Sequence, residues 1–284
     1  MGAVSELELG NACCGYLTRR HYENFWVISW FLPPATRTHL QRIYAYCRIT
    51  DDLGDESGEL AAERLALWRQ DLDRCFPGSR IPPLHPALIA LADTIATCRL
   101  PREPFLDLIA ANLQDQRVKE YTSWEQLRDY CRLSAAPVGR LVLRVAGVAS
   151  PALDALSDDV CIGLQLANFA QDVSVDRAKG RTYLLQPELA ERGLAGAVEA
   201  MCQRASDLLQ SGQLLEAAVD GGLRLQLMLY RRGGEAILRA VAAAGYRTDL
   251  CRPTVSLPAK CGLLALVGLQ AFGRSHHVGE KRPA

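Results

Sequence analysis

The segment from Gln165 to Tyr183, QLANFAQDVSVDRAKGRTY, combines a polar stripe with mostly apolar surroundings. Read as one helix, which turns by about 100° per residue, it places four polar side chains on one face: Gln165, Asn168, Asp172 and Asp176. Two carboxylates one turn apart repel each other, and burying them is costly unless a cation lies between them. Mg²⁺ suits this position, because its usual ligands are carboxylates and the oxygens of a substrate phosphate. The segment therefore predicts a largely buried helix with a metal-binding face.

A second segment, YAYCRITDDLGDE from Tyr44 onward, repeats the pattern. Asp51 and Asp55 are one helical turn apart, and Asp52 adjoins Asp51. Tyr44 and Arg48 precede them on the same face. Either segment alone is compatible with a solvated helix surface. Two such segments on otherwise apolar helices together predict a diphosphate that metal ions hold between two facing acidic helices.

Both segments resemble the aspartate-rich motifs of the squalene and phytoene synthases. The resemblance implies an all-α isoprenoid-synthase fold, with one large helical bundle around a central cavity. It also implies a Mg²⁺-dependent enzyme that acts on an isoprenoid diphosphate. Periods near 3.6 dominate the apolar pattern, which independently favours an all-α protein. We expect the synthase domain to span residues 21–272, between a flexible leader (1–20) and a disordered tail (273–284).

The resemblance assigns roles to individual residues. The implied metal ligands are Asp51, Asp55, Asn168, Asp172 and Asp176. Asp52 and Tyr44 join these five as catalytic residues. The remaining set is expected to bind substrate, and it consists of Asn24, Phe25, Arg48, Ala136, Val138, Gly139, Gln165, Gln171, Lys179, Arg181, Tyr246 and Arg252.

Several of these positions also have a purely structural interpretation. Asn24 fits a helix cap, and Arg252 fits a solvent-exposed side chain. The small residues around Pro137 predict an interrupted helix with room along one face, which either a neighbouring helix or a prenyl tail would fill. Asp107 and Asp115 have no partner motif, and we expect both to be solvated.

Gln171 indicates a subfamily within the squalene and phytoene synthases. Many squalene and phytoene synthases carry arginine at this position of the second motif. Together with the segments ENF (23–25) and SAAPVGRLVL (134–143), the glutamine makes the chain resemble the bacterial hydroxysqualene synthases of the hopanoid and squalene pathways. This implies conversion of presqualene diphosphate to hydroxysqualene, with capture of water and without NADPH.

Three alternatives stay open. The chain is a phytoene or dehydrosqualene synthase, a one-step squalene synthase, or an inactive assembly subunit with the same fold. Other enzymes of squalene synthesis are possible partners.

The composition excludes some classes of function. Lys plus Arg equals Asp plus Glu at 32 each, so no bulk charge indicates a nucleic-acid partner. The 10 cysteines include no CxxC pair, which argues against structural zinc. The N-terminus lacks the pattern of a signal peptide, and we expect a cytoplasmic protein. The apolar run Cys261–Phe272 is shorter than the about 20 residues that a membrane span needs. It predicts a core helix or, alternatively, a surface helix at the inner membrane.

Overall fold

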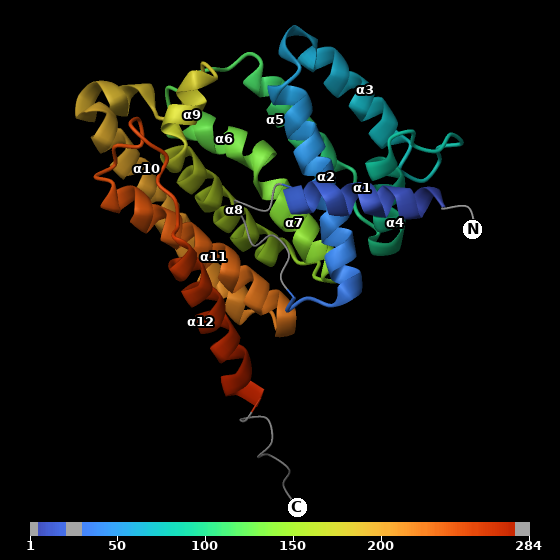
Figure 1. Ribbon diagram of the computed structural model, residues 1–284. Coiled ribbons are helices and arrows are strands. Elements are labelled where there is room, and N and C mark those ends of the chain that lie inside the picture. The colour runs from blue at the N-terminus through green and yellow to red at the C-terminus, as the bar shows by residue number, and fades with distance from the viewer. Residues whose placement is uncertain (1–4, 21–29, 276–284) are drawn as a thin grey trace, which may run out of the picture.

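The computed structural model describes residues 5–20 and 30–275, and within these ranges it is all-α. No β-strand occurs there, although Tyr121 and Leu185 form an isolated bridge. The all-α prediction is thus confirmed (Figure 1). Asn24 and Phe25 lie outside the described residues.

In chain order the helices are α1 (Glu6–Arg20), α2 (Pro34–Asp55), the 3₁₀ turn η1 (Gly58–Leu60), α3 (Ala61–Asp73), α4 (Pro86–Cys98), α5 (Glu103–Asp115), α6 (Trp124–Ser134), α7 (Ala136–Val145), α8 (Pro151–Gln171), α9 (Val173–Ala178), α10 (Gln186–Ala217), α11 (Gly221–Ala243) and α12 (Leu257–Ser275). Proline occupies the first turn of many of them, including α2, α4 and α8. It is tolerated there because the first backbone N–H groups of a helix have no partner within that helix.

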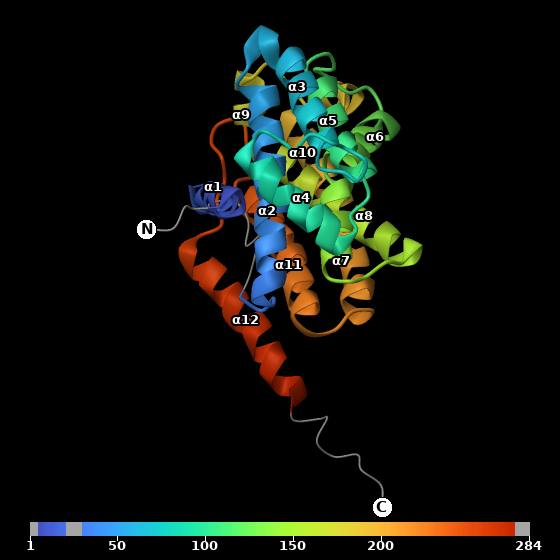
Figure 2. The same cartoon turned by 90° about the vertical axis from the view of Figure 1, so that its right-hand side faces the viewer.

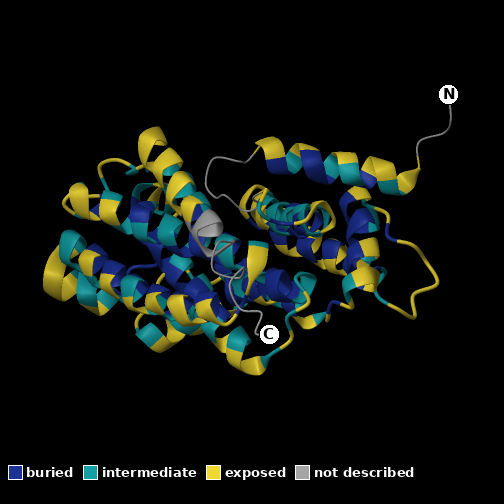
Figure 3. Ribbon diagram, turned by 90° about the horizontal axis from the view of Figure 1, so that it is seen from below, coloured by how far each residue is buried: buried dark blue, intermediate teal, exposed yellow. Residues whose placement is uncertain are grey.

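Two large apolar clusters form most of the core, and two smaller clusters lie under α1 and α12. The first joins α2, α3, α4, α5 and α7, and its largest buried side chains include Tyr46, Leu65 and Phe105. The second joins α6, α8, α10 and α11 around residues such as Leu166 and Val198. Buried residues face inward and exposed residues face outward along most helices (Figure 3). A cavity lined by helices from both clusters lies between them.

Helix α1 corrects the prediction of a flexible leader. Residues 6–20 form a helix that packs on α4 and α2, with Cys14 only 1% exposed. Asn11 accepts a hydrogen bond of 2.9 Å from the buried Arg42 of α2. The buried face of α1 is made mainly of glycine, cysteine and threonine, which is why the apolar periodicity of this segment is weak.

The second acidic segment is two helices instead of one. Helix α8 ends at Gln171, and Asp172 takes a non-helical conformation (φ −100°, ψ 17°) before α9. Gly180 then has φ 70°, a conformation that favours glycine and lets the chain turn back. Lys179 and Arg181 on either side of it thereby approach the end of α2. The predicted interruption near Pro137 is confirmed, since α6 ends at Ser134 and α7 begins at Ala136.

Helix α12 lies on the surface, so the prediction of a core helix is wrong. Leu257 and Leu269 are 74% and 70% exposed, whereas Val267 is fully buried against α11. Only one side of α12 contacts the bundle, and the helix extends past it (Figure 2). It continues to Ser275, into the first residues of the predicted tail. No helix in the described ranges is long and apolar enough to cross a membrane.

We predict that Gly10→Ala destabilises the fold. A Cβ at Gly10 would lie 2.6 Å from the carbonyl oxygen of Pro86, so α1 would have to move away from α4. Overpacking of this kind costs about 1–3 kcal/mol. Gly15→Ala in the same helix is the control, because its closest neighbour is the flexible end of Arg19 at 3.3 Å. Urea unfolding measures both variants, and equal stabilities would contradict tight packing of α1.

Candidate active site

A cavity of about 620 Å³ lies at the centre of the bundle. Its walls come from α2 and α5–α11, together with the end of α1 and the segment after α9. One end is lined by acidic and basic side chains. The other end is apolar and includes Leu40, Val160, Leu215 and Leu227. The cavity therefore suits a molecule with a charged head and a hydrocarbon body.

The change from an apolar to a charged cavity wall follows helices α2 and α8. Along α2 the lining changes from Leu40 and Ile43 to Asp51 and Asp55. Along α8 it changes in the same direction, from Val160 through Asn168 to Asp172 at the end of the helix. Both acidic segments thus meet at one end of the cavity. The structure brings all five sequence-predicted metal ligands to that end, along with Tyr44, Gln165, Lys179 and Arg181.

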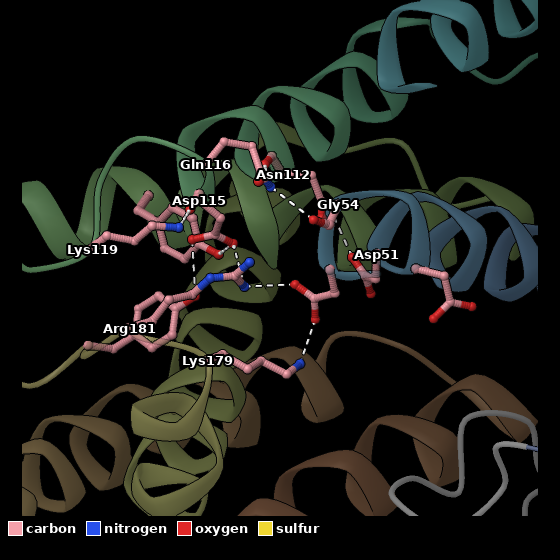
Figure 4. A network of polar contacts seen from close by, with 12 residues as sticks. Asp51, Gly54, Asn112, Asp115, Gln116, Lys119, Lys179 and Arg181 are labelled. Carbon is pink, nitrogen blue, oxygen red and sulfur yellow. Dashed lines mark hydrogen bonds and ion pairs between the residues drawn. The ribbon is translucent and has the colours of Figure 1, made fainter. Parts of the chain in front are cut away.

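Asp55 joins the two acidic segments. Lys179 Nζ lies 2.7 Å from its Oδ2, and Arg181 Nη1 lies 2.7 Å from its Oδ1 (Figure 4). Burial alone would raise the pKa of Asp55, but the hydrogen bonds from these two cations hold that pKa below its ordinary value. Both predicted basic residues are therefore at the charged end of the cavity.

Asp51 has a different environment. The Asn112 side chain on α5 donates a hydrogen bond of 3.1 Å to its Oδ1. Water reaches Asp51 from the cavity, yet desolvation by the surrounding protein raises its pKa to about 6, to which nearby Asp55 and Asp52 also contribute. A carboxylate in this situation attracts a cation.

Asp172 and Asp176 occupy the facing side. Arg252, from the loop before α12, forms an ion pair with Asp172. Desolvation and the charge of Asp172 raise the pKa of Asp176 to about 7, against the influence of Lys179 and Arg181. This contact places Arg252 beside the charged end, although Arg252 itself does not line the cavity.

Gln171 faces away from the cavity, in contrast to its predicted role in substrate binding. It is buried and donates a hydrogen bond of 2.5 Å to the backbone oxygen of Pro253. Arg252 Nη2 donates to its Oε1 at 3.3 Å. Gln171 therefore tethers the loop that presents Arg252, an arrangement that depends on a contact distant in sequence.

Other predicted positions also differ. Asp52 forms an ion pair with Arg48 and is not among the cavity-lining residues, whereas Arg48 is. Tyr246 follows Gly245 with φ 58° and packs against the second core cluster, away from the cavity. Its side chain is directed there because the chain reverses after α11.

Only two of the three residues near Pro137 that were predicted to bind substrate lie on the cavity wall. Val138 and Gly139 line the cavity, but Ala136 is buried in the packing of α7 and does not. A Cβ at Gly139 would lie 2.4 Å from Ser157 Oγ and 2.5 Å from Cys161 Sγ. Close helix packing thus accounts for Gly139, in addition to its place on the cavity wall.

Helix α5 contributes polar residues that the sequence analysis missed. Asn112, Asp115 and Gln116 share one face, and the prediction that Asp115 is solvated is wrong. Its Oδ2 accepts 2.6 Å from the hydroxyl of Tyr130, and its Oδ1 accepts 3.0 Å from that of Tyr183. The available signal was this polar stripe on an otherwise apolar helix, the same pattern that marks the two acidic segments.

Aromatic rings cover the wall beside Asp115. Phe169 and Tyr183 stack with centroids 3.8 Å apart, and Tyr130 stacks on Tyr183 at 5.6 Å. All three line the cavity. Ring faces stabilise a nearby cation without reacting irreversibly with it.

The donor set fits Mg²⁺ in chemistry. Its members are hard oxygen ligands, and the raised pKa values of Asp51 and Asp176 reflect carboxylates that lack full compensation. Within the described ranges, however, no three His, Cys, Asp or Glu side chains are close enough to form a preassembled metal cluster.

The family model for squalene/phytoene synthase matches residues 18–259. The chain belongs to this family. The all-α architecture is accordingly the isoprenoid-synthase fold, and the family acts on isoprenoid diphosphates.

Two solved structures and one curated relative illustrate the similarity. The squalene synthase HpnC from Alicyclobacillus acidocaldarius is 43% identical, with a TM-score of 0.78 over 86% of this chain and 97% of that one. A dehydrosqualene synthase in complex with a ligand is 21% identical and shares the fold, with a TM-score of 0.82 over 94% and 98%. Phytoene synthase 3 of Zea mays is 33% identical over 65% of this chain, and the match spans 44% of that relative.

We predict that Arg252→Gln lowers kcat/KM for diphosphate release about ten- to a hundredfold. Hydrogen bonds to charged groups contribute about 1.5–3 kcal/mol, and Asp172 would lose its cation. Tyr246→Phe is the matched control from the same loop region and should remain within about twofold of wild type, because its side chain lies outside the cavity. Equal losses in both variants would contradict the placement of Tyr246.

We predict that Asp176→Asn stabilises the metal-free fold at pH 8 by about 1–2 kcal/mol, a value reduced because water reaches the cavity. The unfolded carboxyl ionises near pH 3.8 but the folded one near 7, so the native state loses stability as pH rises between these values. The difference should disappear near pH 4. Asp172→Asn, which removes a carboxylate paired with Arg252, should give no such gain. Denaturant unfolding in EDTA measures both, and a less stable Asp176→Asn at pH 8 would refute the prediction.

Proposed function

We propose that the protein converts presqualene diphosphate and water to hydroxysqualene and inorganic diphosphate. The observation that carries the proposal is the cavity, which has one charged end and one apolar end. Such a cavity suits one diphosphate attached to one long hydrocarbon. The 43% identity with an enzyme described as a squalene synthase supports a substrate of this class.

Asp51, Asp55, Asn168, Asp172 and Asp176 are the proposed Mg²⁺ ligands. When bound, the metal would act as a Lewis acid on the departing diphosphate. Lys179, Arg181 and Arg252 add positive charge at the same end. Lys179 and Arg181, which line the cavity, orient the diphosphate by charge-assisted hydrogen bonds and neutralise the charge that develops on it, whereas Arg252 acts through its ion pair with Asp172.

Breaking the carbon–oxygen bond leaves a carbocation, which must be kept from premature capture. The rings of Phe169, Tyr130 and Tyr183 present an apolar, electron-rich wall for this purpose. After rearrangement, a water oxygen adds to the cation and loses one proton. Gln165 and Asn168 line the cavity nearby and are suited to hold that water through their amide groups.

The environment of Gln171 supports a site for one diphosphate. Its side chain binds the loop at Pro253, so this position adds no cation beside Asp172. The proposal also includes catalysis without NADPH, because water and not hydride captures the final cation.

We also propose a peripheral membrane contact, with α12 as the surface involved and the enzyme on the cytoplasmic side. Leu257, Leu266 and Leu269 of α12 are exposed, and a greasy substrate would be drawn from lipid.

Phytoene or dehydrosqualene synthesis is the second candidate. It is favoured by the similarity to phytoene synthases, which reaches 33% identity. These reactions begin from two prenyl diphosphates. An inactive assembly subunit is disfavoured by the convergence of both acidic segments on one cavity.

We predict that the purified protein, given presqualene diphosphate and Mg²⁺ without nicotinamide, forms hydroxysqualene and inorganic diphosphate. Product analysis by mass spectrometry and a diphosphate assay measure the two products. EDTA should stop the reaction. Inertness toward presqualene diphosphate, with phytoene, dehydrosqualene or NADPH-dependent squalene formed from prenyl diphosphates, would refute the proposal.

A further inference from the structure

Asp115 is the most enclosed carboxylate at the charged end of the cavity. Its side chain is 8% exposed, and it lies on α5, a helix outside both acidic segments. Hydroxyls from α6 and from the segment before α10 bind its two oxygens, through Tyr130 at 2.6 Å and Tyr183 at 3.0 Å. The carboxylate is thus held from both sides and points toward the site (Figure 4).

The group that Asp115 faces is Arg181. Arg181 Nη1 lies 3.8 Å from Asp115 Oδ2 and 2.7 Å from Asp55 Oδ1. Its side chain is only 11% exposed, so the guanidinium lies between carboxylates of α5 and α2. Burial alone would lower the pKa of Arg181, but the hydrogen bond to Asp55 and the charge of Asp115 raise it.

One N–H donor of the Arg181 guanidinium, Nε, is buried and makes no hydrogen bond within the part of the protein that the structure describes. Both Arg181 and Asp115 line the cavity. Nε itself is enclosed, but the guanidinium as a whole is held by two carboxylates at the cavity wall, where a ligand oxygen can approach it.

Lys179 offers a comparison within the same site. It binds the other oxygen of Asp55 at 2.7 Å but is 45% exposed, and no contact links it to Asp115. Two cations thus share Asp55, and only one of them is also held by α5. If Asp115 acts by holding Arg181, its replacement should depend on the presence of Arg181 and not on that of Lys179. A general effect on the fold would not make this distinction.

We propose that Asp115 is a positioning residue for diphosphate binding, which acts by holding Arg181 beside Asp55. The inference rests on the proposed function only in that the ligand is a diphosphate bound with Mg²⁺. Without Asp115 the guanidinium keeps one anchor instead of two, and more of its motion must be lost when the diphosphate binds. Tyr130 and Tyr183 contribute by fixing Asp115.

Calorimetric titration with inorganic pyrophosphate in excess Mg²⁺ tests this without any prenyl substrate. Asp115→Asn should weaken binding about five- to tenfold. In an Arg181→Gln background the same substitution should change binding by less than about twofold, because the residue it positions is gone. In a Lys179→Gln background its full effect should remain. Asp107→Asn, in the same helix but off the cavity wall, should bind as wild type does.

The outcomes separate positioning from a structural role. Wild-type or tighter pyrophosphate binding by Asp115→Asn would overturn the proposal. So would a double variant whose loss of affinity equals the product of the losses in Asp115→Asn and Arg181→Gln. If Asp115→Asn does not fold, Tyr183→Phe replaces it, since it removes one hydrogen bond to Asp115 and keeps the charge. That variant should weaken binding about two- to threefold, and only when Arg181 is present. A wild-type protein that binds no pyrophosphate would refute the diphosphate site itself, whereas a different reaction product would leave this inference intact.

Discussion

Repulsion among carboxylates at one end of a partly enclosed cavity is the constraint on which this site depends. Four aspartates from two acidic segments converge there, and desolvation raises the pKa of Asp51 and Asp176. Positive charge must compensate them. The protein supplies part of it through Lys179, Arg181 and Arg252, which come from segments that follow α9 and α11. The turn at Gly180 and the loop tethered by Gln171 bring these cations to the site.

The fold could be predicted from sequence wherever a helix carries an apolar stripe or a proline. Helices α2, α4 and α11 have such signals, and the interruption near Pro137 follows from the missing N–H of proline. The predictions for α1 and α12 were wrong because the apolar content of a segment does not by itself determine its burial. The buried face of α1 is made of small residues, and the apolar run of α12 covers only one side of α11. Burial depends on which surfaces face each other, and no local pattern contains that information.

The site was predicted best where spacing alone determines the chemistry. Asp51 with Asp55, and Asn168 with Asp172, are one turn apart in their segments, so each pair faces the cavity once its helix is placed. Gln171 and Tyr246 were assigned wrongly because their environments depend on contacts across the fold. Gln171 contacts Pro253, and Tyr246 packs on the second core cluster. The polar stripe of α5 marks Asp115, but its burial depends on Tyr130, Tyr183 and Arg181, which come from later segments of the chain.

Gly54 explains why α5 belongs to the site as much as the two acidic segments do. A Cβ at this position would lie 2.3 Å from Asn112 Oδ1, so any larger residue would displace the Asn112 amide between α2 and α5. With glycine here, Gln116 donates a hydrogen bond of 3.0 Å to the backbone oxygen of Gly54, and Asn112 reaches Asp51. The glycine within DDLGD thus brings a third polar helix against the first acidic segment. The geometry of the carboxylates is therefore set by helix packing as well as by their spacing in the sequence.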